Sequence, residues 1–200
     1  MTPILHDDEL AEAPLEQLRA WMAEADPAGR VGEVTASLAT VDEHQHPDVR
    51  IVVIRTVDDD GLTIYSDTRS RKGQDLEQNP RAAILMYWPE LRRQVRLRGP
   101  VEILPDDAND AAFSSRPRPI GYWANHQSAP ISDRQALVAQ AAAVERQLAE
   151  ADEIARPDHW VVYRLVPGTV EFWQAAEDHL HDRIEYRRSA GGWETVRLQP

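Results

Sequence analysis

The sequence predicts a mainly β domain of the α+β class, an antiparallel barrel with helices packed around its outside. Strand-like segments follow one another in runs instead of alternating with helices, which argues against a doubly wound parallel sheet. Hairpin signals separate several of them, DDDG at 58–61 and GG at 191–192. Segment 93–104, RQVRLRGPVEIL, alternates basic and apolar residues, so one side of this strand should be buried and the other should face solvent or a ligand.

The strands follow from short β-branched or alternating segments along the chain. Residues 50–57, RIVVIRTV, are rich in β-branched side chains and are expected to form a buried strand. DEHQHPD at 42–48 is expected to be a polar turn before it. Strands are expected at 34–41, 50–57, 62–67, 81–88 and 93–104, and in four short C-terminal segments at 160–166, 169–173, 183–187 and 193–198.

The helices follow from apolar periodicity and capping residues. Residues 13–25 place Leu15, Leu18 and Met22 on one face. Ser70 is expected to cap a short helix that stops before Pro80. Further helices are expected at 106–115 and at 132–152, the second with an apolar stripe formed by Leu137, Ala141, Val144 and Leu148.

Length and composition limit the class of protein. The 200 residues are expected to form a single domain over 1–200, with residues 1–12 as a flexible N-terminal segment. The absence of cysteine excludes disulfides and thiolate metal ligands. A net charge of −12 argues against nucleic acid as a partner. No segment has the roughly 18 apolar residues that span a bilayer, and the first twenty resemble no targeting peptide, so we expect a cytoplasmic protein without a membrane partner.

Two basic segments stand out in this acidic chain, RSRK at 69–72 and RRQVRLR at 92–98. Such local basic pockets suit a small anionic ligand. SRKG follows an expected strand and opens an expected helix, so the helix N-terminal amides, Arg71 and Lys72 could bind a phosphate together. The alternative is a solvated turn, which is the more common outcome for a single tetrapeptide.

The segment EFWQAAEDHLHDR, residues 171–183, raises the question of a metal or anion site. In an extended strand, Glu177, His179, His181 and Arg183 would line one face. Two imidazoles and a carboxylate could bind zinc, but a guanidinium on the same face repels a dication. We therefore expect no metal, and favour an anion-binding face over a solvated strand edge. No nucleophile motif accompanies the serines at 114 and 115.

Several of these segments occur together in one known family. RIVVIR, YSDTRSRKG, NPRAAILMYW, RRQVRLRGPVE, SRP, HQSAPIS, EFWQ, HLHDR and WETVRLQP stand in the order seen in the pyridoxamine 5′-phosphate oxidase family. The resemblance covers roughly residues 13–200. It implies an FMN-binding split β-barrel that works as a homodimer, with the flavin in the cleft between subunits.

The resemblance also implies roles for individual residues. FMN contacts are expected from Arg50, Ile51, Val52, Val53, Arg55, Tyr65, Ser66, Arg71, Lys72, Gln94, Gln127, Ser128, Trp173 and Arg183. Substrate contacts are expected from Arg55, Arg116, His179 and His181, with His181 and Arg116 in the catalytic role of orienting substrate near the flavin. Cations would hold the FMN phosphate, and an aromatic side chain would face its ring system.

The substrate side departs from the family pattern. Arg55 stands where the family has a lysine, Ala112 where it has a tyrosine, and His179 where it has an arginine. The implied activity is oxidation of pyridoxine or pyridoxamine 5′-phosphate to pyridoxal 5′-phosphate, with hydride transfer to the flavin and O2 as acceptor. One alternative is oxidation of a carboxylated, dihydrophenazine-type aromatic in phenazine biosynthesis. Another is a flavin-binding split barrel without catalytic activity.

Overall fold

The computed structural model describes residues 5, 10–26, 34–115, 126–149 and 154–200 of the chain. The helices in this part are α1 (Pro14–Ala25), α2 (Arg71–Gln78), α3 (Asp106–Ser114) and α5 (Arg134–Leu148). The strands are β1 (Thr35–Val41), β2 (Pro47–Val53), β3 (Thr56–Val57), β4 (Leu62–Asp67), β5 (Arg81–Trp88), β6 (Arg93–Ile103), β7 (Trp160–Leu165), β8 (Thr169–Gln174), β9 (Asp182–Ser189) and β10 (Gly192–Arg197).

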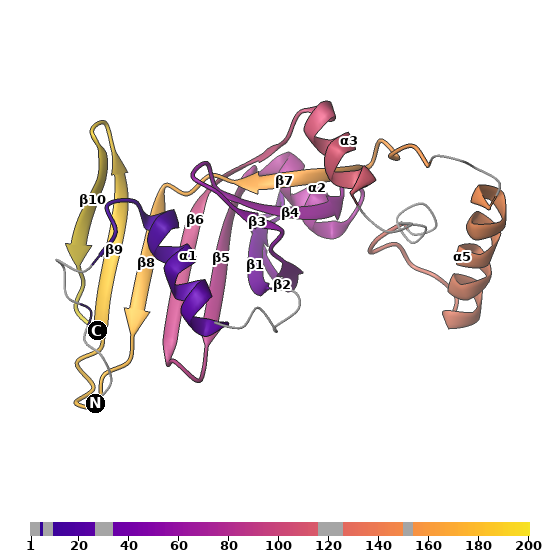
Figure 1. The fold of residues 1–200 in the computed structure, drawn as a ribbon. Coiled ribbons are helices and arrows are strands. Elements are labelled where there is room, and N and C mark those ends of the chain that lie inside the picture. Colours follow the sequence, from indigo (N-terminus) through magenta and orange to yellow (C-terminus); the bar gives the residue numbers. More distant parts are fainter. Residues whose placement is uncertain (1–4, 6–9, 27–33, 116–125, 150–153) are drawn as a thin grey trace.

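All strand pairs in this part of the chain are antiparallel. Seven strands follow the order β10-β9-β8-β6-β5-β1-β2, and β3, β4 and β7 form a branch from it. The long strand β6 joins the two parts, because Arg93–Arg98 pair with β8 and Val101–Ile103 pair with β7. The sheet is curled and the helices lie outside it (Figure 1). The predicted antiparallel architecture with external helices is therefore confirmed.

Helix α1 lies across the sheet beside β6 and β8 (Figure 1) and closes the main core. Trp21 of α1 packs edge-on against Phe172 of β8 with ring centroids 5.0 Å apart, and Phe172 packs against Tyr186 of β9 at 5.7 Å. All three side chains are buried. Such edge-to-face aromatic pairs add to the free energy of burial, so this cluster attaches the helix to the sheet.

The segment 50–57 differs from the expected single buried strand. The chain turns between β2 and β3, because the Ile54 amide donates to Val34 whereas the Arg55 amide donates to Thr63 of β4. It thus passes from pairing with β1 to pairing with β4. Strand β2 ends the main strand order, and its Val49 and Ile51 side chains are 65% and 66% exposed. Ile51 therefore faces outward, whereas Val52 and Ile54 are buried.

One expectation about a helix is also corrected. Helix α5 stands apart from the sheet (Figure 1), and none of its side chains is buried, so the stripe predicted at 132–152 covers no core in this chain. Leu5, within the segment 1–12 that is expected to be flexible, is buried, and its amide donates to Asp182 while its carbonyl accepts from Arg197. Residues 1–4 and 6–9 lie outside the described part of the chain. No helix in the described ranges is long and apolar enough to cross a membrane.

Candidate functional site

The N-terminus of α2 forms the centre of the candidate site. The predicted cap is confirmed, because the Ser70 Oγ accepts a hydrogen bond from the Gly73 amide at 3.2 Å. A glycine is needed at 73, since a Cβ there would lie 2.3 Å from the Thr68 carbonyl oxygen. The first turn of α2 therefore packs directly on the chain that leaves β4. This close approach places Arg71 and Lys72 beside the end of that strand.

The Lys72 ammonium contacts three neutral oxygens. Its Nζ donates to Ser66 Oγ at 2.9 Å, to Ser70 Oγ at 3.3 Å and to Gln127 Oε1 at 3.3 Å. Burial lowers the pKa of Lys72, the nearby Arg50 charge lowers it further, and Asp67 partly offsets both. In the part of the chain that the structure describes, no carboxylate forms an ion pair with Nζ. A half-buried cation held only by neutral groups is suited to an anionic ligand.

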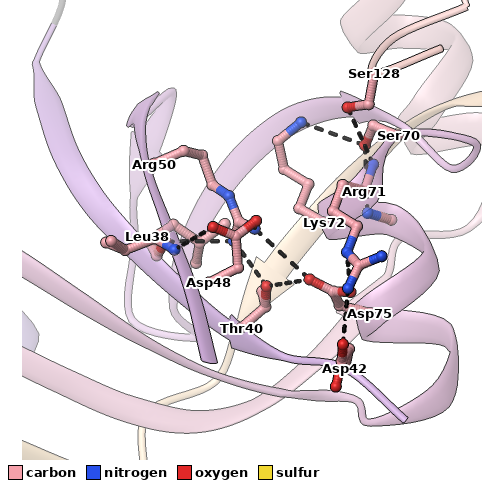
Figure 2. Close-up of polar contacts among 12 residues, drawn as sticks. Leu38, Thr40, Asp42, Asp48, Arg50, Ser70, Arg71, Lys72, Asp75 and Ser128 are labelled. Carbon is pink, nitrogen blue, oxygen red and sulfur yellow. Dashed lines mark hydrogen bonds and ion pairs between the residues drawn. The ribbon is translucent and has the colours of Figure 1, made fainter. Parts of the chain in front are cut away.

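Two arginines flank this lysine, and both are held by carboxylates (Figure 2). The Arg71 guanidinium forms ion pairs with Asp42 at 2.7 Å and with Asp75 at 3.2 Å. Arg50 of β2 forms ion pairs with Asp48 at 2.7 Å and with Asp75 at 3.6 Å. Cations from a strand and from a helix are therefore fixed next to one another.

A distant segment completes this cluster. The Arg71 backbone amide donates to Ser128 Oγ at 3.2 Å, across 57 positions of sequence. Ser128 has a φ of 69°, a left-handed conformation that is uncommon for residues other than glycine. Together with the Gln127 contact to Lys72, this bond brings the QS pair to the N-terminus of α2. We call Arg50, Ser66, Arg71, Lys72, Gln127 and Ser128 the α2 cluster.

A second group of predicted site residues lies on β6, β8 and β9. Gln94 pairs in register with Trp173, and Trp173 with Arg183, so the three side chains share one face of the sheet. The Arg183 Nε donates to Glu171 at 2.9 Å. Burial opposes ionisation of Glu171, but hydrogen bonds from Arg183 and then Arg96 lower its pKa. We call Gln94, Trp173, His181 and Arg183 the β8–β9 cluster.

The two histidines occupy a turn and not a strand, which corrects the expectation of a single face from Glu177 to Arg183. Strand β9 begins at Asp182, and His179 has a φ of 65°. The turn nevertheless places the His181 ring 5.1 Å from Trp173 and 6.0 Å from His179. The Ala176 amide donates to His181 Nδ1 at 3.1 Å, which leaves Nε2 to carry the proton of a neutral imidazole.

Several other predicted residues that the structure describes lie outside these two clusters. The Arg55 guanidinium is 5.2 Å from the Tyr65 ring centroid, and Tyr65 packs on Trp160. Tyr65 thus faces away from its neighbour Ser66. Val52 is buried in the core and Val53 is half-buried. Arg116 falls outside the described residues.

Sequence reasoning missed the carboxylates that hold the site arginines. Asp75 follows Arg71 by four positions, which is the spacing of an ion pair on a helix. This contact could therefore have been predicted from the sequence. No sequence pattern indicated the role of Glu171, because its contacts with Arg183 and Arg96 depend on the strand order β6-β8-β9.

The lowered pKa of Lys72 predicts how anion binding depends on pH. A phosphate stabilises the charged ammonium, so the pKa of Lys72 must rise on binding, and affinity must fall as pH rises through the pKa of the free site. We expect FMN affinity to decrease as pH rises toward the ordinary pKa of lysine, with the decrease beginning below that value because the pKa of Lys72 is lowered, while riboflavin affinity changes little. Fluorescence titration of both flavins at each pH checks this. Equal pH dependence for both would contradict the prediction.

Two family models match this chain and together span most of it. The model described as pyridoxamine 5′-phosphate oxidase matches residues 7–148. The model described as the pyridoxine 5′-phosphate oxidase C-terminal dimerisation region matches residues 160–200. The first range holds the α2 cluster, and the second holds Trp173, His181 and Arg183.

Individual relatives agree with these matches. A pyridoxine/pyridoxamine 5′-phosphate oxidase from Ralstonia pickettii (strain 12J) is 45% identical over 192 residues, 94% of this chain and 89% of the relative. A protein of the same name from Salinibacter ruber (strain DSM 13855 / M31) is 42% identical over 200 residues, 98% of this chain and 93% of the relative.

Solved structures agree in fold. The crystal structure of PhzG from Burkholderia lata 383, in complex with tetrahydrophenazine-1-carboxylic acid, has a TM-score of 0.90 and 33% identity, and the match covers 100% of this chain and 99% of that chain. A pyridoxamine 5′-phosphate oxidase-related, FMN-binding protein from Nostoc punctiforme PCC 73102 has a TM-score of 0.75 at 21% identity, with 96% and 100% covered. The predicted split barrel is confirmed by these matches.

Proposed function

Because this chain belongs to the pyridoxamine 5′-phosphate oxidase family and is an FMN-dependent oxidoreductase, we propose that it oxidises pyridoxine or pyridoxamine 5′-phosphate to pyridoxal 5′-phosphate. The acceptor in this proposal is O2, and the whole chain, 1–200, acts as one domain. The observation that carries the proposal is the Lys72 ammonium, half-buried against neutral oxygens and flanked by Arg50 and Arg71. Such a cation fits the phosphate of FMN.

The α2 cluster would bind that phosphate. Lys72 supplies the charge that Ser66 and Gln127 do not neutralise, and the N-terminus of α2 adds its amides and its dipole. Phosphate oxygens accept charge-assisted bonds from ammonium and guanidinium groups. The residues present therefore fit the phosphate end of FMN.

The β8–β9 cluster would contact the flavin ring system from the other subunit. On one chain, β9 lies toward one end of the sheet and α2 toward the other (Figure 1), so a single copy does not enclose one ligand with both clusters. The family is homodimeric, and its dimerisation region spans residues 160–200. A two-fold axis could place Trp173 and Arg183 of one subunit opposite the α2 cluster of its partner. This arrangement gives two equivalent sites per dimer.

Bound FMN would supply the redox chemistry, taking up hydride from the substrate and returning electrons to O2. The chain supplies position and electrostatics. His181 would donate a hydrogen bond from Nε2–H to the substrate and so orient it, since Nδ1 accepts from the Ala176 amide. Arg116, Arg55 and His179 would attract the anionic group of the substrate.

The test is the visible spectrum of the purified protein followed by substrate-dependent O2 consumption. We expect a yellow protein that converts pyridoxine 5′-phosphate to pyridoxal 5′-phosphate, with O2 consumed in step. A protein that stays colourless after addition of FMN would exclude the flavin assignment. A yellow protein with no product at saturating substrate would exclude this substrate and leave the flavin assignment intact.

A second substrate class has a specific observation in its favour. Ala112 and Tyr65 pack against the same apolar cluster, and the Arg55 guanidinium lies beside the Tyr65 ring, so two departures from the family pattern, Ala112 and Arg55, border this cluster or a residue that packs on it. A small side chain at 112 leaves more room there than a tyrosine. The similar PhzG structure contains tetrahydrophenazine-1-carboxylic acid. We therefore propose a carboxylated, reduced aromatic as the alternative substrate, and the same O2 assay with such a compound distinguishes the two.

A further inference from the structure

Asp75 lies between the two arginines of the α2 cluster (Figure 2). Its side chain is only 2% exposed, and Oδ1 is 3.2 Å from Arg71 Nε. Oδ2 is 3.6 Å from the Arg50 guanidinium and accepts a hydrogen bond from Thr40 Oγ1 at 2.6 Å. One buried carboxylate therefore contacts groups from β1, β2 and α2.

These contacts determine the relative positions of the arginines. Arg50 NH1 also donates to Thr40 Oγ1 at 2.7 Å, so Thr40, Arg50 and Asp75 form a closed triangle of polar contacts. Two guanidinium groups so close together repel each other unless an anion lies between them. Asp75 is that anion in the described part of the chain.

Two other carboxylates in the described part of the chain pair with these arginines, and each contacts only one of the two. Asp42 pairs with Arg71 but not with Arg50, and Asp48 pairs with Arg50 but not with Arg71. The Asp48 side chain is also 50% exposed, so water weakens its ion pair. Asp75 is therefore the carboxylate that couples the strand arginine to the helix arginine.

We propose that Asp75 is a positioning residue of the FMN-phosphate site: it does not touch the phosphate, and it fixes Arg50 and Arg71 in the geometry that binds it. This inference rests on the proposed binding of the FMN phosphate by the α2 cluster. Removal of the Asp75 charge has two opposite effects on a bound phosphate. It relieves a like-charge repulsion, and it releases both guanidinium groups. Asp75 contacts the guanidinium groups directly, so the loss of position dominates.

The experiment compares Asp75→Asn with wild type in the affinities for FMN and for riboflavin, which has no phosphate. Asparagine has the same shape as aspartate, and its side-chain oxygen can still accept the hydrogen bond from Thr40. It has no negative charge, and its NH2 group would meet the N–H donors of a guanidinium group, so it cannot hold both arginines. We expect FMN to bind about tenfold more weakly, the size of one lost charge-assisted hydrogen bond, and riboflavin affinity to change less than about twofold. The control is Asp110→Asn on α3, which removes an Asp–Arg contact with Arg156 outside the site and should change neither affinity.

A double-mutant cycle with Arg50→Met separates positioning from a general structural effect. If Asp75 acts through Arg50, the double variant should bind FMN more tightly than the product of the two single effects predicts. Equal losses for FMN and riboflavin, or unchanged or tighter FMN binding by Asp75→Asn, would overturn the inference. If Asp75→Asn does not fold, Thr40→Val replaces it, because this variant removes the hydroxyl that orients Asp75. Its affinity for FMN should fall more than its affinity for riboflavin. Failure of wild type to bind FMN would instead reject the proposed function.

Discussion

Replacement of Lys72 by methionine is expected to weaken FMN binding by about 100-fold, because the ammonium is the cation of the site least neutralised by the protein. Methionine has an unbranched apolar side chain of similar length. The substitution therefore removes the positive charge that contacts the three oxygens and changes the packing little. Titration of flavin fluorescence measures the dissociation constant. Riboflavin, which lacks the phosphate, should bind the variant about as well as wild type.

The same substitution should not destabilise the protein without flavin. Burial already lowers the pKa of Lys72, which means that the folded state disfavours its charge. The free energy of unfolding of the ligand-free variant should therefore equal or exceed that of wild type. Arg81→Met removes an exposed cation outside both clusters and serves as the control. An affinity for FMN within about threefold of wild type would show that Lys72 does not bind the phosphate.

Replacement of Phe172 by alanine is expected to lower the free energy of unfolding by about 3–5 kcal/mol. Phe172 is fully buried and contacts both Trp21 of α1 and Tyr186 of β9, so its removal leaves a cavity between the helix and the sheet. Urea unfolding followed by tryptophan fluorescence measures the change. Variants must be compared at one protein concentration, because dimerisation contributes to stability.

The control for this prediction is Phe172→Leu, which retains most of the apolar volume and should cost much less. Val138→Ala on α5, where the side chain is 55% exposed, should have almost no effect on the isolated subunit. A loss below about 1 kcal/mol in Phe172→Ala would mean that α1 is held to the sheet by other contacts.

Local patterns were sufficient where a turn, a helix cap or a regular alternation of side chains marks an element. Segments 62–67 and 81–88 form β4 and β5 with the predicted bounds, because hairpin and alternation signals act over a few residues. Ser70 caps α2 as predicted, since a cap is a contact between residues three positions apart. The resemblance across ordered blocks predicted the family and its fold, which the matches over 7–148 and 160–200 confirm.

Local patterns were misleading where one sequence pattern is compatible with more than one backbone conformation. The run RIVVIRTV reads as a buried strand, but the chain changes pairing partner at Ile54 and Arg55, and Ile51 faces outward. The alternation of His179 and His181 predicts that both lie on one face of a strand. The positive φ of His179 instead turns the chain before β9 begins. At Ile54 and Arg55 the pairing partner decided which local conformation was adopted, and hydrophobicity alone does not encode the partner. At His179 the chain turns within the connection between β8 and β9, where the His179 amide donates to the Ala176 carbonyl.

The sequence by itself determined the position of most helices and strands, the helix cap beside Arg71 and Lys72, and the family to which the chain belongs. Only the tertiary structure decided that Ser128 reaches Arg71 across 57 positions, that Asp75 links Arg71 to Arg50, and that Trp173 and Arg183 lie in a separate cluster. The physical reason is that helix periodicity and capping are short-range, whereas hydrogen bonds and ion pairs between distant segments depend on strand order and on how closely α2 packs against β4.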